Sequence, residues 1–140
     1  MMKQTWLSDK YYKERRLKVQ PISILIADGD PIIRQCMRHA ASMEVNVVDV
    51  WEAENGLQAL MIAKDKHPDL IIMDALLPRM DGMETTRCLR QWLVATKIII
   101  ISDHAQSEDL AREAGADEFV LKDACCDVLR SLLHRMLEFD

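Results

Sequence analysis

The sequence predicts an α/β fold with a flavodoxin-like, doubly wound parallel sheet of five strands. Short apolar runs, such as residues 70–73 and 98–101, are too short for helices and too apolar for strands with one wet face, so they are typical of strands buried on both faces. Such runs alternate with segments whose apolar residues recur at helical spacing. This alternation favours right-handed crossovers with helices on both faces of the sheet. The expected strand order is 2-1-3-4-5.

The elements are expected as five strand–helix pairs. Pro31 suits the first turn of the first helix, and Pro68 ends the second. Ser107 is expected to cap the fourth helix, which Gly115 ends. In the third helix, Trp92 is expected to face the core with Leu89 and Leu93. The expected strands span 22–27, 47–53, 70–73, 97–102 and 118–121, and the expected helices span about 31–40, 57–63, 83–94, 107–114 and 127–137. Core positions are expected at Ile22, Leu25, Ile71, Ile99 and Val120.

Composition and charge indicate one domain, residues 21–140, after a basic extension, residues 1–20. The chain has 140 residues, of which 49% are hydrophobic, enough for a full core. The extension holds six Lys/Arg and two acids, net +4, so the overall charge of −5 leaves −9 for the domain. An acidic domain argues against nucleic acid as a direct ligand. No apolar run approaches the roughly 18 residues that span a bilayer, and the start lacks the apolar segment of a signal peptide, so we expect no membrane partner and a cytoplasmic location.

Polar residues end four of the expected strands: Asp28, Asp74, Ser102 and Lys122. The carboxyl ends of parallel strands meet at one edge of the sheet, where ligands bind, so these side chains are expected to converge. Two carboxylates beside a hydroxyl and an ammonium suit Mg²⁺ and a phosphoryl group. The pattern therefore predicts a phosphoryl-transfer site with Asp74 as the nucleophile. The simpler alternative is that Asp74 only caps the following turn.

From about residue 22 to residue 136, the chain resembles the receiver domain of bacterial two-component response regulators. The resemblance rests on Ile-Leu-Ile-Ala-Asp ending at Asp28, on residues 74–82, on Ile-Ile-Ser ending at Ser102, and on Gly-Ala-Asp-Glu-Phe-Val-Leu-Lys ending at Lys122. It implies that Asp74 accepts a phosphoryl group from the phosphohistidine of a sensor histidine kinase or of a phosphotransfer protein. It also implies a signalling domain that assists its own phosphotransfer and dephosphorylation, and not an enzyme in its own right.

The same resemblance implies roles for further residues. Ser102 and Lys122 would hold the phosphate, and Mg²⁺ would be bound by Asp28, Asp74 and the main-chain carbonyl of Leu76. Phe119 would be an aromatic switch that moves with Ser102. Receivers commonly form homodimers or meet partners through the helix–strand–helix face that corresponds to residues 107–137. The Lys-Asp-Ala run that begins at Lys122 resembles receivers that precede a helix-turn-helix output domain, and no such domain is expected within these residues.

Two departures distinguish this chain from the usual family pattern. Gly29 replaces the second of two adjacent acids, the one that binds the metal directly, and Asp30 leaves the loop from a different point. Asp103 follows Ser102 where Ala or Gly is usual in the family. Its carboxylate would either repel phosphate or take the place of the missing metal ligand. His104 stands where receivers tune dephosphorylation. These residues leave open a degenerate receiver that acts by phosphorylation-independent protein interaction.

A second class of protein shares one of these motifs. Asp28-Gly29-Asp30 also resembles the Asp-x-Asp loop of haloacid-dehalogenase-like phosphatases, in which Asp28 would attack and Asp30 would be the acid. That family has no phosphoacceptor on the third strand, so the position of Asp74 disfavours it. A flavin-binding protein of the same fold would need a Ser/Thr/Gly-rich phosphate loop after the first strand, where this chain is acidic.

Overall fold

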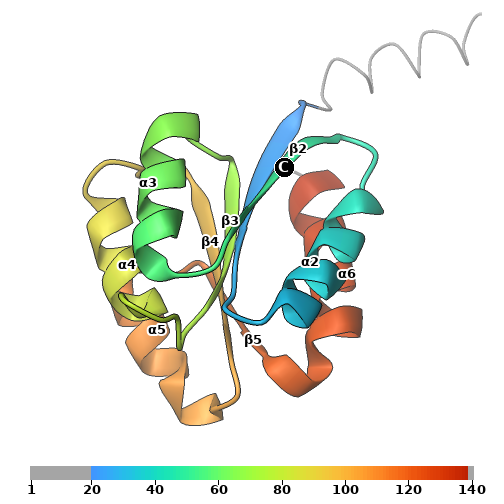
Figure 1. Cartoon of the computed structure of the whole chain (residues 1–140). Coiled ribbons are helices and arrows are strands. Elements are labelled where there is room, and N and C mark those ends of the chain that lie inside the picture. The colour runs from blue at the N-terminus through green and yellow to red at the C-terminus, as the bar shows by residue number, and fades with distance from the viewer. Residues whose placement is uncertain (1–19, 139–140) are drawn as a thin grey trace, which may run out of the picture.

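The computed structural model describes residues 20–138, apart from the side chains of residues 124–126 and 138, and forms a three-layer α/β fold (Figure 1). Its five strands are all parallel, in the order β2-β1-β3-β4-β5. The predicted doubly wound sheet and its strand order are thereby confirmed. The strands are β1 (Ile22–Ala27), β2 (Val47–Ala53), β3 (Leu70–Asp74), β4 (Lys97–Ser102) and β5 (Glu118–Leu121).

Helices cover both faces of the sheet. Figure 1 shows α2 and α6 on one face and α3, α4 and α5 on the other. The α-helices of the described chain are α2 (Pro31–Ser42), α3 (Gly56–Lys66), α4 (Gly82–Arg90), α5 (Glu108–Ala114) and α6 (Cys125–Glu138). Short 3₁₀ turns at Ala105–Ser107 and Lys122–Ala124 precede the last two. The predicted extension, residues 1–20, lies outside the described residues except for Gln20.

The central strands are buried on both faces. Alternate residues face opposite layers: Leu25 and Ile71 pack toward α3, α4 and α5, whereas Ile24 and Ile72 pack toward α2 and α6. Each fully buried side chain of this size contributes roughly 1.5–3 kcal/mol. Leu25, Ile71, Ile99 and Val120 are buried as expected, whereas Ile22, at the open end of β1, is only half-buried.

The third helix is shorter than the sequence predicts, because α4 ends at Arg90 and not near residue 94. The guanidinium of Arg90 donates hydrogen bonds to the carbonyls of Leu93 and Thr96 and pairs with Asp117 at 2.6 Å. These contacts hold the chain after Arg90 in a loop. Trp92 is therefore half-exposed, with Lys64 Nζ 4.2 Å from its ring centroid, and the expectation that it faces the core is wrong.

The start of the fourth helix also differs from the prediction. Ser107 ends a 3₁₀ turn, and its side chain makes no capping hydrogen bond to α5. The chain therefore enters α5 through a continuous turn, without an N-cap side chain.

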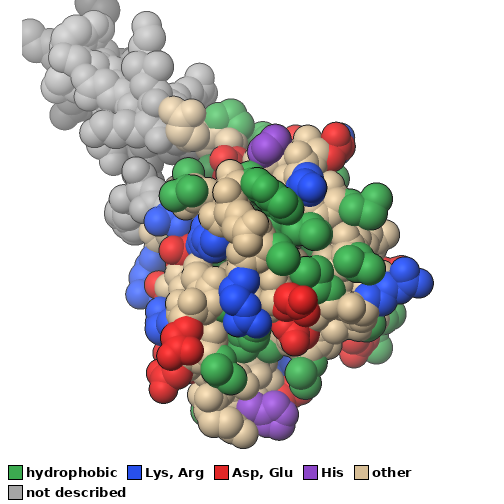
Figure 2. All heavy atoms as spheres, turned by 90° about the vertical axis from the view of Figure 1, so that its left-hand side faces the viewer, with side chains coloured by type: hydrophobic (Ala, Val, Ile, Leu, Met, Phe, Trp, Pro, Cys, Tyr) green, Lys and Arg blue, Asp and Glu red, His purple; other side chains and the backbone are tan. Residues whose placement is uncertain are grey.

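Apolar side chains gather on the face that α3, α4 and α5 form (Figure 2). α3 and the loop after α4 contribute exposed apolar residues: Leu57, Met61, Trp92 and Val94. Within the described part of the chain, no helix combines the length and apolar character needed to cross a membrane.

Candidate functional site

The sheet brings three of the predicted site residues into direct contact at its carboxyl edge. Lys122 Nζ lies 2.9 Å from Oδ2 of Asp74 and 3.3 Å from Oδ2 of Asp28. The parallel register explains this convergence, because Ala27 pairs with Met73 and Asp74 pairs with Ile101. The carboxyl ends of β1, β3 and β5 therefore bring Asp28, Asp74 and Lys122 together, and the Lys122 ammonium bridges the two carboxylates.

Asp28 is an almost completely buried acid, with 1% of its surface exposed. Its Oδ1 accepts a hydrogen bond of 2.8 Å from the amide of Asp30. Its Oδ2 has the Lys122 ammonium as an ion-pair partner but no donor in hydrogen-bonding geometry. Burial raises the pKa of Asp28 above its ordinary value, and the charge of Asp74 adds to this, although the Asp30 amide and Lys122 oppose it.

Lys122 is held in its charged form by the two acids. Burial acts to lower the pKa of Lys122, but the hydrogen bond that Lys122 donates to Asp74 and the charges of Asp74 and Asp28 outweigh burial and raise the pKa. Its side chain is 18% exposed. The site therefore contains a positive charge that is still partly exposed to solvent.

The loop after β3 fixes the carboxylate of Asp74. Its Oδ1 accepts a hydrogen bond of 3.2 Å from the amide of Leu76, and Oδ2 accepts one from Lys122. The loop then folds back on the strand, so that a Cβ at Gly82 would collide with the carbonyl oxygen of Asp74. Asp81 caps α4 by accepting a hydrogen bond from the amide of Glu84. The interpretation of Asp74 as only a turn cap accounts for the Leu76 contact but not for the pairing with Lys122.

Ser102 lies at the same edge but does not join this contact. Its hydroxyl oxygen accepts a hydrogen bond of 3.0 Å from the amide of His104, and Ser102 is 1% exposed. Ser102 pairs in register with Leu121, the residue before Lys122. Phe119 is half-buried against the core on the α3, α4 and α5 side.

Four loop residues near the site differ in what they contribute. Asp30 turns its carboxylate to the amide of Ile32 and caps α2, so in this structure it does not supply the ligand that Gly29 lacks. This geometry also disfavours the Asp-x-Asp phosphatase interpretation, because the Asp28 carboxylate faces Lys122 whereas the Asp30 carboxylate binds the amide of Ile32. Asp103, His104 and Leu76 are exposed, Leu76 by 65%.

The oxygen ligands suit a hard cation that keeps most of its water. Oδ2 of buried Asp28 accepts no hydrogen bond, and the Asp74 carboxylate lies beside the same Lys122 ammonium. Carboxylate oxygens are the ligands that Mg²⁺ prefers. Gly29 adds no side chain, and no group of three or more metal-binding side chains exists in the described part of the chain. The residues fit Mg²⁺, but with fewer protein ligands than an adjacent pair of acids would give.

A site of this kind, on a 2-1-3-4-5 sheet, defines a doubly wound α/β protein with an acidic pocket bridged by a lysine. Residues 24–134 match the family described as the response regulator receiver domain. The chain belongs to this family, whose members act in two-component signalling. The predicted resemblance is thus confirmed.

Individual relatives agree with this assignment. The chain is 34% identical over 118 residues to the nitrate/nitrite response regulator protein NarL of Escherichia coli, covering 83% of this chain and 55% of NarL. It is 32% identical over 116 residues to the chemotaxis protein CheY of Halobacterium salinarum, covering 76% of this chain and 95% of CheY. The chain therefore spans about half the length of relatives such as NarL but nearly all of CheY.

Solved structures show the same fold. The receiver domain of the putative response regulator NarL from Mycobacterium tuberculosis superposes with a TM-score of 0.77 at 26% identity, covering 86% of this chain and 99% of that domain. A LuxR-family two-component response regulator from Aurantimonas sp. superposes with a TM-score of 0.76 at 30% identity, covering 84% of this chain and 86% of that one.

One residue at the edge of the site was not anticipated from the sequence. Arg34 of α2 donates a hydrogen bond of 2.7 Å from Nη1 to the main-chain carbonyl of Asp28. Arg34 lies one turn into a helix that starts beside the acidic loop, and this position could have indicated a role near the site. Its partner is a main-chain atom, however, and no sequence pattern names such a partner.

Proposed function

We propose that Asp74 accepts a phosphoryl group from the phosphohistidine of a sensor histidine kinase or of a phosphotransfer protein, and that the modified domain changes its protein contacts. The observation that carries this proposal is the position of Lys122, whose ammonium lies 2.9 Å from Asp74 and 3.3 Å from Asp28. In this role the chain is a phosphoacceptor and not an enzyme that turns over a separate substrate.

The proposed transfer assigns a separate task to each of these residues. A carboxylate oxygen of Asp74 forms a bond to phosphorus while the phosphorus–nitrogen bond of the donor breaks, and the imidazole keeps the electron pair. Lys122 can follow the negative charge from the carboxylate to the phosphoryl oxygens. The Ser102 hydroxyl, which donates to the His104 carbonyl at 3.4 Å, would have to turn from that partner to donate to one of them. Mg²⁺, when bound through Asp28, Asp74 and the Leu76 carbonyl, would neutralise charge on the transferring group.

The test is phosphorylation of the full chain by acetyl phosphate and Mg²⁺, followed by intact mass. Wild type should gain the mass of one phosphoryl group, and Asp74→Asn should gain none. Asp81→Asn is the matched control, because Asp81 is a carboxylate on the same loop that caps α4, and Asn caps helices equally well. The proposal fails if wild type stays unmodified or if Asp74→Asn gains the same mass.

The switch and its output form a second part of the proposal. We infer that phosphorylation draws Ser102 toward the phosphoryl group, lets Phe119 follow, and changes association through the face of α5, β5 and α6. The described side chains of these elements include the exposed apolar residues Leu110, Leu121 and Val128, which supports a protein contact there. A homodimer through this face, the absence of direct nucleic-acid binding by this domain and a cytoplasmic location stay predictions.

Gly29 favours one alternative, a degenerate receiver that signals by protein contacts alone. A site with few metal ligands would accept a phosphoryl group slowly or not at all, and the charge of exposed Asp103 acts in the same direction. In that case the mass experiment gives no adduct, and the association of the chain is the same with and without phosphodonor.

A further inference from the structure

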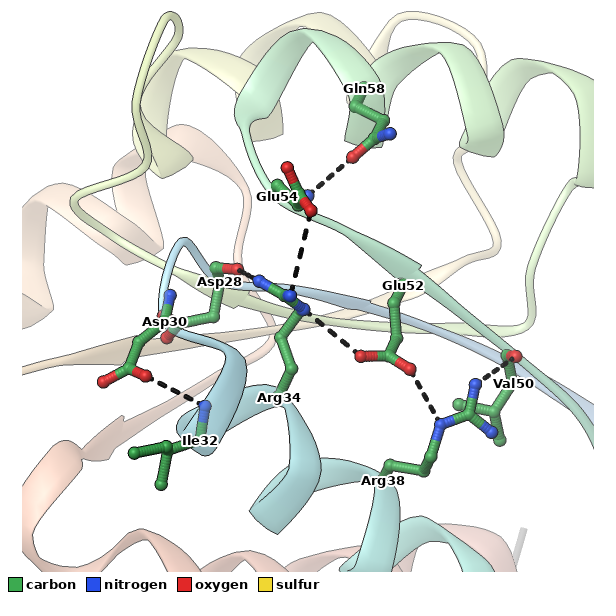
Figure 3. Close-up of polar contacts among 9 residues, drawn as sticks. All are labelled: Asp28, Asp30, Ile32, Arg34, Arg38, Val50, Glu52, Glu54 and Gln58. Atoms are coloured by element: carbon green, nitrogen blue, oxygen red, sulfur yellow. Dashed lines mark hydrogen bonds and ion pairs between the residues drawn. The ribbon is translucent and has the colours of Figure 1, made fainter.

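The loop between β1 and α2 is held at its main chain by Arg34. Nη1 of Arg34 donates a hydrogen bond of 2.7 Å to the carbonyl oxygen of Asp28, and the side chain is 12% exposed (Figure 3). The same residue, Asp28, directs its carboxylate to Lys122 at 3.3 Å. Arg34 therefore binds the backbone that carries the buried acid of the site, without touching the reacting atoms.

Glu52 of β2 fixes the orientation of Arg34. Its Oε1 accepts from Nε of Arg34 at 3.2 Å, and its Oε2 accepts from Nε of Arg38 at 2.9 Å. Arg38 also donates to the carbonyl of Val50 (Figure 3). A planar guanidinium that is bound on two sides cannot turn without breaking a contact, so β2, α2 and the acidic loop are joined through Arg34.

Gly29 increases the need for such a contact. A Cβ at Gly29 would lie 3.4 Å from Cδ of Pro78, close to ordinary van der Waals distance, so crowding does not require glycine there. A glycine without such a requirement adds conformational freedom that must be lost when the loop is ordered. Other hydrogen bonds also hold the loop. The Asp28 amide donates to the Ala53 carbonyl at 3.1 Å, the Asp30 amide donates to Asp28 Oδ1, and the Asp30 carboxylate accepts from the Ile32 amide.

We propose that Arg34 is a positioning residue, which holds the main chain of Asp28 so that its carboxylate faces Lys122 and Asp74. The effect on the loop is independent of phosphorylation, whereas the effect on the phosphorylation rate rests on the proposed function. Arg38, one turn further along α2 and also bound to Glu52, makes no contact with the loop in the described structure and supplies a matched control.

The first test is amide hydrogen exchange of the full chain, observed at Asp30. The Asp30 amide reports directly on the loop because it donates to Asp28 Oδ1. Arg34→Met keeps the length of the side chain but removes the guanidinium, so exchange at Asp30 should accelerate by about tenfold, the effect of one lost hydrogen bond. Exchange at Ile26 in β1 corrects for any change in global stability. Arg38→Met should leave the ratio of the two rates as in wild type.

The second readout is the initial rate of phosphorylation by acetyl phosphate at saturating Mg²⁺. We expect a decrease of about tenfold in Arg34→Met, a smaller decrease in Arg34→Lys and no change in Arg38→Met. Glu52→Gln removes the charge but keeps one oxygen that can accept from Arg34, so it weakens the hold on the guanidinium without removing it. It should give an intermediate result at both readouts, and it replaces Arg34→Met if that variant does not fold.

The outcomes separate the two proposals. An Asp30-to-Ile26 ratio that is the same in wild type and Arg34→Met, or that changes equally in Arg38→Met, overturns the role of Arg34. If wild type takes up no phosphoryl group, the proposed function fails, but the exchange ratio still decides whether Arg34 positions the loop.

Discussion

Nζ of Lys122 lies 2.9 Å from Oδ2 of Asp74, although the two residues are 48 positions apart in the chain. Asp28 completes the group, so that two acids share one ammonium in a partly buried pocket. Burial raises the pKa of Asp28, and the charge of Asp74 adds to this, while the Asp30 amide and Lys122 oppose it. Two acids and one ammonium leave an excess of negative charge in this pocket.

Replacing Asp28 by Asn should stabilise the fold near neutral pH. Because the pKa of Asp28 is raised in the folded state, the folded state binds its proton more tightly than the unfolded state does. The free energy of unfolding therefore falls as pH rises from about the ordinary value of 3.8 through the raised pKa, and it stays lower above it. Asp28→Asn removes this decrease, so the variant should be more stable than wild type at pH 7, and by less at pH 4. Urea unfolding at pH 4 and pH 7 measures it.

The control for this effect is Asp81→Asn, which removes an exposed carboxylate and should leave stability nearly unchanged. A variant Asp28→Asn that is less stable than wild type at pH 7, or that keeps the same difference at pH 4 and pH 7, contradicts the prediction.

Gly29→Asp should tighten Mg²⁺ binding. A side chain fits at this position, because a Cβ would lie 3.4 Å from Pro78 and 3.7 Å from the Glu54 carbonyl. A carboxylate there adds one hard ligand, and we expect the dissociation constant of Mg²⁺ to fall by about tenfold or more. Isothermal titration calorimetry of Gly29→Asp, with Gly29→Asn as an uncharged control of equal size, measures the change. Equal affinity in wild type and Gly29→Asp would show that position 29 does not limit metal binding.

The phosphorylated form should decay slowly because of Leu76. Hydrolysis needs a water in line behind phosphorus, and the 65%-exposed apolar side chain of Leu76 offers that water no hydrogen bond. Leu76→Asn supplies one and should accelerate decay by about tenfold. Decay is followed by intact mass after removal of the phosphodonor, with Leu76→Met as the apolar control. Loss of the phosphoryl group within seconds in wild type, or equal decay in the Asn variant, means that another group controls the lifetime.

Phe119 should couple phosphorylation to association. It packs half-buried against the core and pairs in register with Ile100, two residues before Ser102 on β4, so a shift of Ser102 can reach it through the adjacent strand. In Phe119→Ala, association that depends on phosphorylation should be lost, as measured by analytical ultracentrifugation with and without acetyl phosphate. Phe119→Leu retains an apolar side chain and controls for loss of stability, which is about 3–5 kcal/mol for a fully buried Phe and smaller here. Unchanged phosphorylation-dependent association in the Ala variant contradicts the coupling.

The fold and much of the site follow from local sequence signals. The bounds of β1 and β5 are those that apolar runs and turn residues indicate, and parallel topology alone brings Asp28, Asp74 and Lys122 to one edge. The end of α4 was not predictable in this way. Arg90 draws in carbonyls from the loop after the helix and from Gly115, 25 residues away, and helical periodicity contains no information on such contacts.

Two aspects of the site depend equally on tertiary contacts. Asp30 belongs to an acidic motif, but the N-terminus of α2 takes its carboxylate as a cap. Arg34 resembles any basic residue on an amphipathic helix until β2 places Glu52 beside it. Contacts between a side chain and the main chain of another element, such as that of Arg34 with the Asp28 carbonyl, can be identified only from the structure.

The identity of the phosphoacceptor is tested most directly by chemical trapping. An aspartyl phosphate is an acyl phosphate, which borohydride reduces to an alcohol, so a modified aspartate becomes homoserine and keeps its place in the sequence. Wild-type protein is treated with acetyl phosphate and Mg²⁺, reduced, digested and sequenced by mass spectrometry. We predict homoserine at position 74 alone, and none when acetyl phosphate is left out. Homoserine at another aspartate, such as Asp28 or Asp103, or at no position despite a phosphoryl adduct on the intact chain, would contradict the assignment of Asp74.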